Sequence, residues 1–244
     1  MTGQIADASP QRTARIAGGL YLLVVITGIF ALVARPALVV RGDAAATAAN
    51  IVASEGLYRL TWTADLVATV FYVGVTVFLH ALFAPVNRTI SLLAASFGFA
   101  GCVIGATLSL NGLAPLMVLG GAPHLAVFSP DQRLALAQLT SGSQGAGANV
   151  NFVFFGCYCL TLGYLTYRSA FLPRILGVLL AVAGLAWLTN SFAAFLSPPL
   201  ARLLTPYPLA IGALGEIAFT LWLLVRGVDA RRWQEQASTV GARR

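Results

Sequence analysis

Six long apolar stretches dominate the chain, and the segments between them carry arginine, proline or glycine. A helix needs about 20 apolar residues to cross a lipid bilayer, and each stretch reaches or approaches that length. They are Ile16–Ala34, Leu60–Ala84, Ile90–Leu110, Gly147–Tyr167, Leu172–Leu196 and Pro208–Val225. The pattern predicts an all-α polytopic membrane protein, a bundle of six transmembrane helices.

Two segments between the spans carry helix signals of their own. In RGDAAATAANIVASEGLYR, Asp43 is placed to cap a short helix and Gly56 to end it. In SPDQRLALAQL, Ser129 precedes a proline and lies three residues before Gln132, the spacing of a capping box. We expect short amphipathic external helices, acting as lids over a cavity or as plain connectors. The small-residue run Ser141–Ala148 predicts a flexible linker into the fourth span.

Polar segments flank the apolar part of the chain. We expect a polar N-terminus over residues 1–14, a six-helix membrane domain over residues 15–228 and a polar tail over residues 229–244. The tail should fray beyond its first turn. Its Trp233 is suited to the membrane interface, where aromatic side chains are enriched.

The composition excludes a water-soluble domain. The 244 residues are 58% hydrophobic and 9% charged, whereas soluble domains carry about 25% charged residues. The net charge is +7, and all 15 basic residues are arginines. Because these arginines lie between apolar stretches rather than on one water-facing surface, we expect no nucleic-acid partner.

The distribution of the arginines predicts an orientation. With six spans, ten of the 15 arginines fall on the side of the two termini and the other five fall on the opposite side. Segments rich in arginine remain in the cytoplasm. We therefore expect both termini to be cytoplasmic.

Polar side chains nevertheless run along the second span. Six of them fall within about 100° of arc on a helix with 100° per residue, and we call them the polar stripe: Thr61, Asp65, Thr69, Tyr72, Thr76 and His80. Such a stripe is disfavoured against lipid and belongs toward the bundle interior or a wet cavity.

A second acid lies near the middle of the sixth span. Glu216 stands where a carboxylate costs about 2.5–3.5 kcal/mol on insertion scales, so it should be paired, hydrated or protonated. Asparagines occupy the outer halves of other spans. We therefore expect a polar pocket in the outer half of the bundle. Its candidate ligand-binding residues are Asp65, Thr69, Tyr72, Asn111, Asn149, Asn151 and Glu216.

No sequence pattern predicts a catalytic residue, a metal site or a cofactor. The chain has no G-x-S-x-G turn, no H-E-x-x-H helix and no phosphate-binding glycine loop. In this topology, His80 and His124 lie on opposite sides of the membrane. Cys157 and Cys159 are two residues apart, so they point to roughly opposite sides of one helix.

The two acids leave three functions open. The first is a small-molecule or proton-coupled carrier, or a membrane ligand-binding protein, built around Asp65 and Glu216. The second is an intramembrane enzyme acting on a lipid-like substrate, and the third is a structural or accessory subunit. The expected partners are membrane lipids and a small-molecule or lipid-like ligand. The sequence predicts no oligomeric state.

Several segments resemble, in order, those of a known bacterial family. They are RIAGGLYLLVVITGIFA, VVRGDAAATAANIVASEGLYR, ADLVATVFYV, FSPDQRLALAQL, NFVFFGCYCLTLGYLTYRSAFLPRILGVLLAVAGL and ALGEIAFTLWLLVRGV. Over about Arg15 to Val228 the chain resembles the domain-of-unknown-function 4386 family. The resemblance implies a multi-pass protein of the bacterial cytoplasmic (inner) membrane. It implies no reaction, cofactor or site residue.

Overall fold

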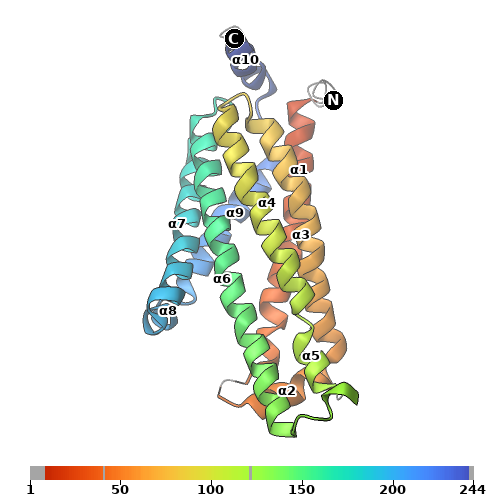
Figure 1. Ribbon diagram of the computed structural model, residues 1–244. Helices are drawn as coiled ribbons and strands as arrows, with labels where there is room; N and C mark the ends of the chain where they lie inside the picture. Colours follow the sequence, from red (N-terminus) through yellow and green to blue (C-terminus); the bar gives the residue numbers. More distant parts are fainter. Residues whose placement is uncertain (1–8, 41, 121–122, 242–244) are drawn as a thin grey trace. The chain divides into compact units, whose positions relative to one another are not determined.

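The computed structural model describes residues 9–40, 42–120 and 123–241, and every regular element within these ranges is a helix (Figure 1). Six helices are long: α1 (Pro10–Ala34), α3 (Glu55–Phe83), α4 (Arg88–Asn111), α6 (Pro130–Arg168), α7 (Arg174–Leu196) and α9 (Tyr207–Val225). The short ones are η1 (Pro36–Leu38), α2 (Ala44–Ala53), α5 (Ala114–Leu119), η2 (Pro123–Leu125), α8 (Pro198–Leu204) and α10 (Ala230–Gly241). The predicted fold class is confirmed.

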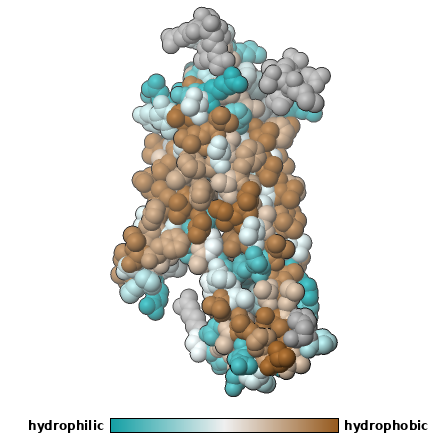
Figure 2. Space-filling view, in the orientation of Figure 1, coloured by the Kyte–Doolittle hydropathy of each residue, from teal (hydrophilic) through white to brown (hydrophobic). Residues whose placement is uncertain are grey.

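The six long helices are suited to a bilayer in length and in surface. Within the described ranges, six helical segments of 19 to 39 residues have the hydropathy of membrane spans. Large apolar side chains such as Leu185 on α7 and Leu214 on α9 are more than half exposed, which water would disfavour and lipid does not. The face drawn in Figure 2 is largely hydrophobic over these helices, and hydrophilic residues gather near α10. The chain is a multi-pass membrane protein.

The chain forms two compact units. Unit 1 contains Met1–Leu23, Phe71–Cys102 and Asn149–Arg244, and unit 2 contains Val24–Val70 and Val103–Ala148. Helices α1, α3, α4 and α6 each contribute one part to each unit. The two predicted acids fall in different units, Asp65 in unit 2 and Glu216 in unit 1.

In unit 1, glycines allow the helices to approach closely. A Cβ added at Gly163 of α6 would lie 2.8 Å from the carbonyl oxygen of Gly177 on α7, and one added at Gly177 would lie 2.6 Å from that of Gly163. A Cβ at Gly215 of α9 would lie 2.6 Å from the carbonyl oxygen of Leu179. Helices α7 and α9 accordingly run side by side (Figure 1). Small residues at helix interfaces are typical of membrane proteins, because they let backbones meet.

The start of α1 and the end of α9 are tied together within unit 1. The Gln11 side chain donates to the Arg226 carbonyl at 2.9 Å and accepts from the Val228 amide at 2.7 Å. Both ends of the membrane domain therefore lie on the same side of this unit, as an even number of spans requires.

The C-terminal tail differs from the sequence-based expectation. Instead of fraying beyond one turn, it forms the 12-residue helix α10. Its Trp233 donates to the carbonyl of Leu82 at 2.8 Å, and Gln236 accepts from the amide of Ala170 at 3.1 Å. These bonds fix the tail to the last turn of α3 and to the segment after α6, which explains why it remains helical.

Unit 2 has a small apolar core and two confirmed helix caps. The core consists of Leu38, Ile51, Tyr58, Trp62 and Leu116. Asp43 accepts from the Ala46 amide at 2.8 Å and so caps α2. Ser129 and Gln132 form the predicted reciprocal capping box at the start of α6.

Two boundaries in unit 2 were predicted wrongly. Gly56 does not end α2, because that helix ends at Ala53 with Ser54 as its C-cap, and Gly56 lies in the first turn of α3. The run Ser141–Ala148 is not a linker but part of the continuous helix α6. Serine and threonine hydroxyls there bond to carbonyls of the preceding turn, as Ser141 does to Ala137 at 2.9 Å. Backbone groups near lipid must be satisfied internally, which favours helix despite the glycines.

Candidate functional site

The polar stripe of α3 lies within the protein, as predicted. Thr61, Tyr72 and Thr76 are buried, and Asp65, Thr69 and His80 are half-buried. Its three threonines bond to carbonyls of the preceding turn: Thr61 to Tyr58 at 2.7 Å, Thr69 to Asp65 at 2.9 Å and Thr76 to Tyr72 at 2.8 Å. The stripe therefore turns away from the apolar surface.

Glu216 is the most deeply placed acid of unit 1. It lies near the middle of α9 and is 7% exposed. Trp187 of α7 donates its indole N–H to one carboxyl oxygen at 2.7 Å, and Tyr21 of α1 donates its hydroxyl to the other at 3.1 Å. Gly212, one turn before Glu216, faces the Trp187 indole, since a Cβ there would lie 2.5 Å from the ring. Three helices thus meet at this carboxyl group.

Aromatic rings surround the donors of Glu216. Tyr21 packs edge-on against Tyr72, with ring centroids 5.8 Å apart, and Tyr72 packs edge-on against Tyr158 at 5.5 Å. Phe155 meets Trp187 edge-on at 5.6 Å. The hydroxyls of Tyr72 and Tyr158 are buried without a hydrogen-bond partner of good geometry. The carboxyl group therefore lies in an environment that is largely apolar but edged by hydroxyls.

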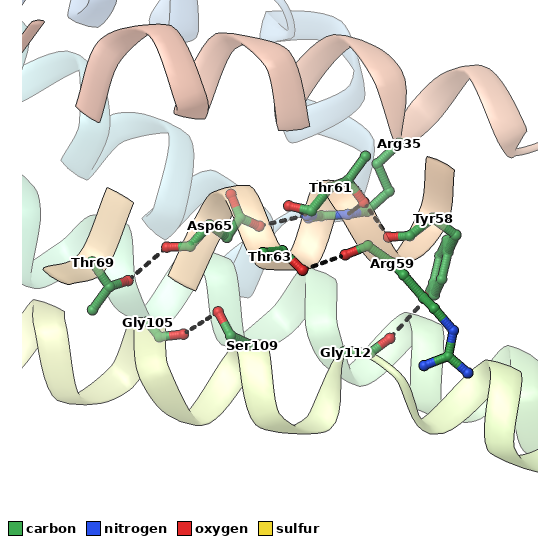
Figure 3. A network of polar contacts seen from close by, with 10 residues as sticks. All are labelled: Arg35, Tyr58, Arg59, Thr61, Thr63, Asp65, Thr69, Gly105, Ser109 and Gly112. Atoms are coloured by element: carbon green, nitrogen blue, oxygen red, sulfur yellow. Dashed lines mark hydrogen bonds and ion pairs between the residues drawn. The ribbon is translucent and has the colours of Figure 1, made fainter. Parts of the chain in front are cut away.

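Asp65 has a different environment in unit 2. It forms an ion pair with Arg35, which follows the last residue of α1, and Arg35 also bonds to the hydroxyl and carbonyl of Thr61 at 3.3 and 3.2 Å (Figure 3). The side chains of Arg35 and Asp65 are 26% and 31% exposed. The Arg35 guanidinium also lies 3.6 Å from the ring centroid of Trp62, a cation–π contact. Asp65 is therefore compensated by a full positive charge.

A second arginine near Asp65, Arg59, is not its partner. Although Arg59 lies on α3 with Asp65, it pairs with Glu55 one turn earlier at 2.7 Å. Figure 3 shows its guanidinium directed away from Asp65.

The remaining predicted residues are divided between the units. In unit 2, Thr69 bonds to its own helix, and the exposed Asn111 donates to the Thr107 carbonyl at 2.9 Å. In unit 1, Asn149 accepts from Asn190 at 3.1 Å, which links α6 to α7. Unit 1 also holds Asn151, whose amide oxygen would lie 3.1 Å from a Cβ at Gly101 of α4. Unit 1 thus contains Tyr72, Asn149, Asn151 and Glu216, and unit 2 contains Asp65, Thr69 and Asn111.

Sequence reasoning missed three residues that hold the acids. Tyr21 and Trp187 occur in apolar runs where an aromatic residue indicates only membrane burial, so no local signal marks them as partners of Glu216. Arg35 could have been found, because it follows the first predicted span at the membrane face where the second span, which contains Asp65, begins. Comparing the predicted depth of charged residues in the membrane would have paired the two.

The described side chains do not assemble a metal site. In the ranges given above, no group of three His, Cys, Asp or Glu side chains is placed to hold an ion. Cys102, Cys157 and Cys159 are free thiols.

The long apolar helices and the intramembrane carboxyl group define an integral membrane protein of the multi-pass class. Within that class, the chain belongs to the family described as Domain of unknown function (DUF4386), whose model matches residues 16–227. The match confirms the family resemblance and its extent.

One relative comes from an archaeon. The chain is 31% identical to an uncharacterized protein of Archaeoglobus fulgidus over 94 residues, which are 37% of this chain and 51% of that protein. The chain thus spans about half the length of this relative. No solved structure matches the chain significantly.

Proposed function

We propose that the chain is a proton-coupled carrier of a small or lipid-like molecule, with Glu216 as its proton-binding group. One observation supports this above all others: the carboxyl group of Glu216 is buried in mid-span and is held by two neutral donors, Trp187 and Tyr21. Neutral donors can accommodate the carboxylate without cancelling its charge.

The energetics favour a group that changes its protonation state. Ionised at mid-bilayer, a carboxylate costs about 2.5–3.5 kcal/mol on insertion scales. Hydrogen bonds to a charged group return about 1.5–3 kcal/mol each, so the ionised and the protonated forms of Glu216 come close in free energy. A glutamine could join the same helices at no charge cost, because its amide oxygen can accept from Trp187 and its amide N–H can donate to the Tyr21 hydroxyl. Glutamate adds the ability to take up and release a proton.

The ligand-binding residues of this proposal remain those expected from the sequence. They are Tyr72, Asn149, Asn151 and Glu216 in unit 1, and Asp65, Thr69 and Asn111 in unit 2. The partly exposed pair of Arg35 and Asp65 is suited to a polar or charged group of the ligand, because each side chain could exchange its present partner for that group. Membrane lipids are the other expected partners.

The proposed setting is the bacterial cytoplasmic membrane with both termini in the cytoplasm. Support comes from exposed arginines at helix ends of unit 1 that include both ends of the membrane domain. They are Arg12, Arg15, Arg88, Arg168, Arg174, Arg226, Arg231 and Arg232. Arginine-rich flanks remain on the cytoplasmic side.

The test measures whether ligand retention depends on Glu216 protonation. The wild type, Glu216→Gln and Asp65→Asn are purified in detergent, and compounds that copurify are identified by mass spectrometry at several pH values. We expect the amount retained by the wild type to change with pH and the amount retained by Glu216→Gln to be independent of pH. Glu235→Gln on α10 is the matched control, because Glu235 is exposed and bonds only along its own helix to Arg231. It should retain the wild-type profile.

Two results would count against a carrier. Identical pH profiles for the wild type and Glu216→Gln would remove the proton-binding role. A lower melting temperature for Glu216→Gln, with no compound bound to any variant, would indicate that Glu216 only joins helices.

A further inference from the structure

Two buried tyrosine hydroxyls in unit 1 call for an explanation. Tyr72 is 8% exposed and Tyr158 is 1% exposed, yet neither hydroxyl has a hydrogen-bond partner of good geometry. A buried polar group left unsatisfied costs about 1–3 kcal/mol. Phenylalanine would fit both positions without that cost, so the hydroxyls are candidates for a role beyond packing.

These hydroxyls belong to a row of rings that begins at Glu216. We name Tyr21, Tyr72 and Tyr158 the tyrosine row. Tyr21 donates to Glu216 at 3.1 Å. Its ring meets Tyr72 at 5.8 Å, and Tyr72 meets Tyr158 at 5.5 Å, both edge-on. The row therefore leads from the carboxyl group across α1, α3 and α6.

The row continues toward the end of α3. Thr76 and Tyr158 both lie over Gly98 of α4, since a Cβ there would be 2.7 Å from the threonine hydroxyl and 3.2 Å from the tyrosine ring. Beyond them is a narrow internal space that both line, together with His80 and Ser91.

The His80 ring nitrogen Nδ1 lies 3.0 Å from the Ser91 hydroxyl. His80 is half-buried and occupies the last turn of α3. It therefore joins the interior of unit 1 to the exterior.

We propose that the tyrosine row, Thr76 and the His80–Ser91 pair form the path by which protons reach Glu216. This inference rests on the proposed proton-binding role of Glu216. In each step, a hydroxyl accepts a proton from one neighbour and passes its own proton to the next, so only O–H and N–H bonds change and no electrons are transferred. A hydroxyl without a fixed partner can turn between two neighbours, as such a relay requires.

Neighbouring hydroxyls supply most of this relay, because those of Tyr72 and Thr76 adjoin that of Tyr158. The step from Thr76 to His80 crosses the internal space that both side chains line. The titratable side chains that face Glu216 are Tyr21 from α1, Tyr72 from α3 and Cys159 from α6. A fourth neighbouring helix, α7, contributes the neutral Trp187. The tyrosines therefore offer the path of hydroxyl groups.

The test follows hydrogen exchange at Glu216. Protein in lipid vesicles is transferred from H2O to D2O, and the shift of the protonated carboxyl band is followed by infrared spectroscopy, with Glu216→Gln assigning the band. We expect Tyr158→Phe and Tyr72→Phe each to slow the exchange about tenfold, which corresponds to about 1.4 kcal/mol in barrier. Tyr164→Phe on α6 is the matched control, because Tyr164 is 47% exposed. It should exchange as fast as the wild type.

Stability separates this role from packing. Removing an unsatisfied buried hydroxyl should leave the melting temperature of Tyr158→Phe unchanged or raised, while the exchange slows. Wild-type exchange in both Tyr72→Phe and Tyr158→Phe would overturn the path and leave Glu216 as a proton-binding group. Absence of any band that depends on Glu216 would instead overturn the proposed function, and the path with it.

Discussion

The two intramembrane acids of this chain lie in contrasting surroundings. In unit 2, Asp65 is about one-third exposed and is paired with the cation of Arg35. In unit 1, Glu216 is 7% exposed and its hydrogen-bond partners, Trp187 and Tyr21, are neutral. An acid paired with arginine can remain ionised at low cost, whereas an acid held by neutral donors gains from binding a proton. Only the second arrangement is suited to repeated proton uptake and release.

The largest expected loss of stability follows removal of the indole donor from Glu216. Trp187→Phe retains an aromatic ring but deletes the 2.7 Å bond, and at a pH at which Glu216 is ionised we expect it to lower the free energy of unfolding by about 2 kcal/mol, as for other bonds to charged groups. Unfolding in mixed detergent micelles measures the loss. The control is Trp222→Phe, the same change at a half-buried position of α9.

A double-mutant cycle separates the hydrogen bond from packing. In a Glu216→Gln background, the cost of Trp187→Phe should shrink, because the charged acceptor is absent. An equal loss of unfolding free energy in both backgrounds would show that Trp187 acts through packing alone. The hydrogen bond to Glu216 would then no longer distinguish this acid from Asp65.

A smaller loss is expected when Asp65 loses its cation. Arg35→Met should lower the free energy of unfolding by about 1–2 kcal/mol, less than the 3–5 kcal/mol for fully buried pairs, because both side chains are partly exposed. The same unfolding assay applies. Arg59→Met is the matched control: its pair with Glu55 is about half exposed, and such pairs contribute about 0.2–1 kcal/mol.

Restoring charge balance should rescue the Arg35 variant. Adding Asp65→Asn to Arg35→Met removes the unpaired carboxylate, so the double variant should recover part of the loss. A double variant less stable than Arg35→Met alone would mean that Asp65 depends on other partners than Arg35.

The helices of this fold were more predictable than the contacts between them. The length and the apolar composition of a span are properties of one continuous segment, so the six long helices could be predicted from the sequence. Caps such as Asp43 and Ser129 are also local signals. The linker expected at Ser141–Ala148 was wrong, because small polar residues can remain in a helix when their hydroxyls bond to carbonyls of the preceding turn.

The candidate site was predictable only in part, because its contacts join distant segments. The polar stripe and Glu216 followed from their cost in lipid, but the donors Tyr21 and Trp187 depend on which helices are neighbours. Gly163 and Gly177 bring α6 and α7 together, and each looks unremarkable within its own span.

The central claim is that Glu216, and not Asp65, binds a proton in the folded protein. It is tested most directly by infrared spectra of the wild type, Glu216→Gln and Asp65→Asn in lipid vesicles across a range of pH. A protonated carboxyl band should rise and fall with pH in the wild type, be absent from Glu216→Gln and persist in Asp65→Asn. A band that vanishes in Asp65→Asn and survives in Glu216→Gln would contradict the claim.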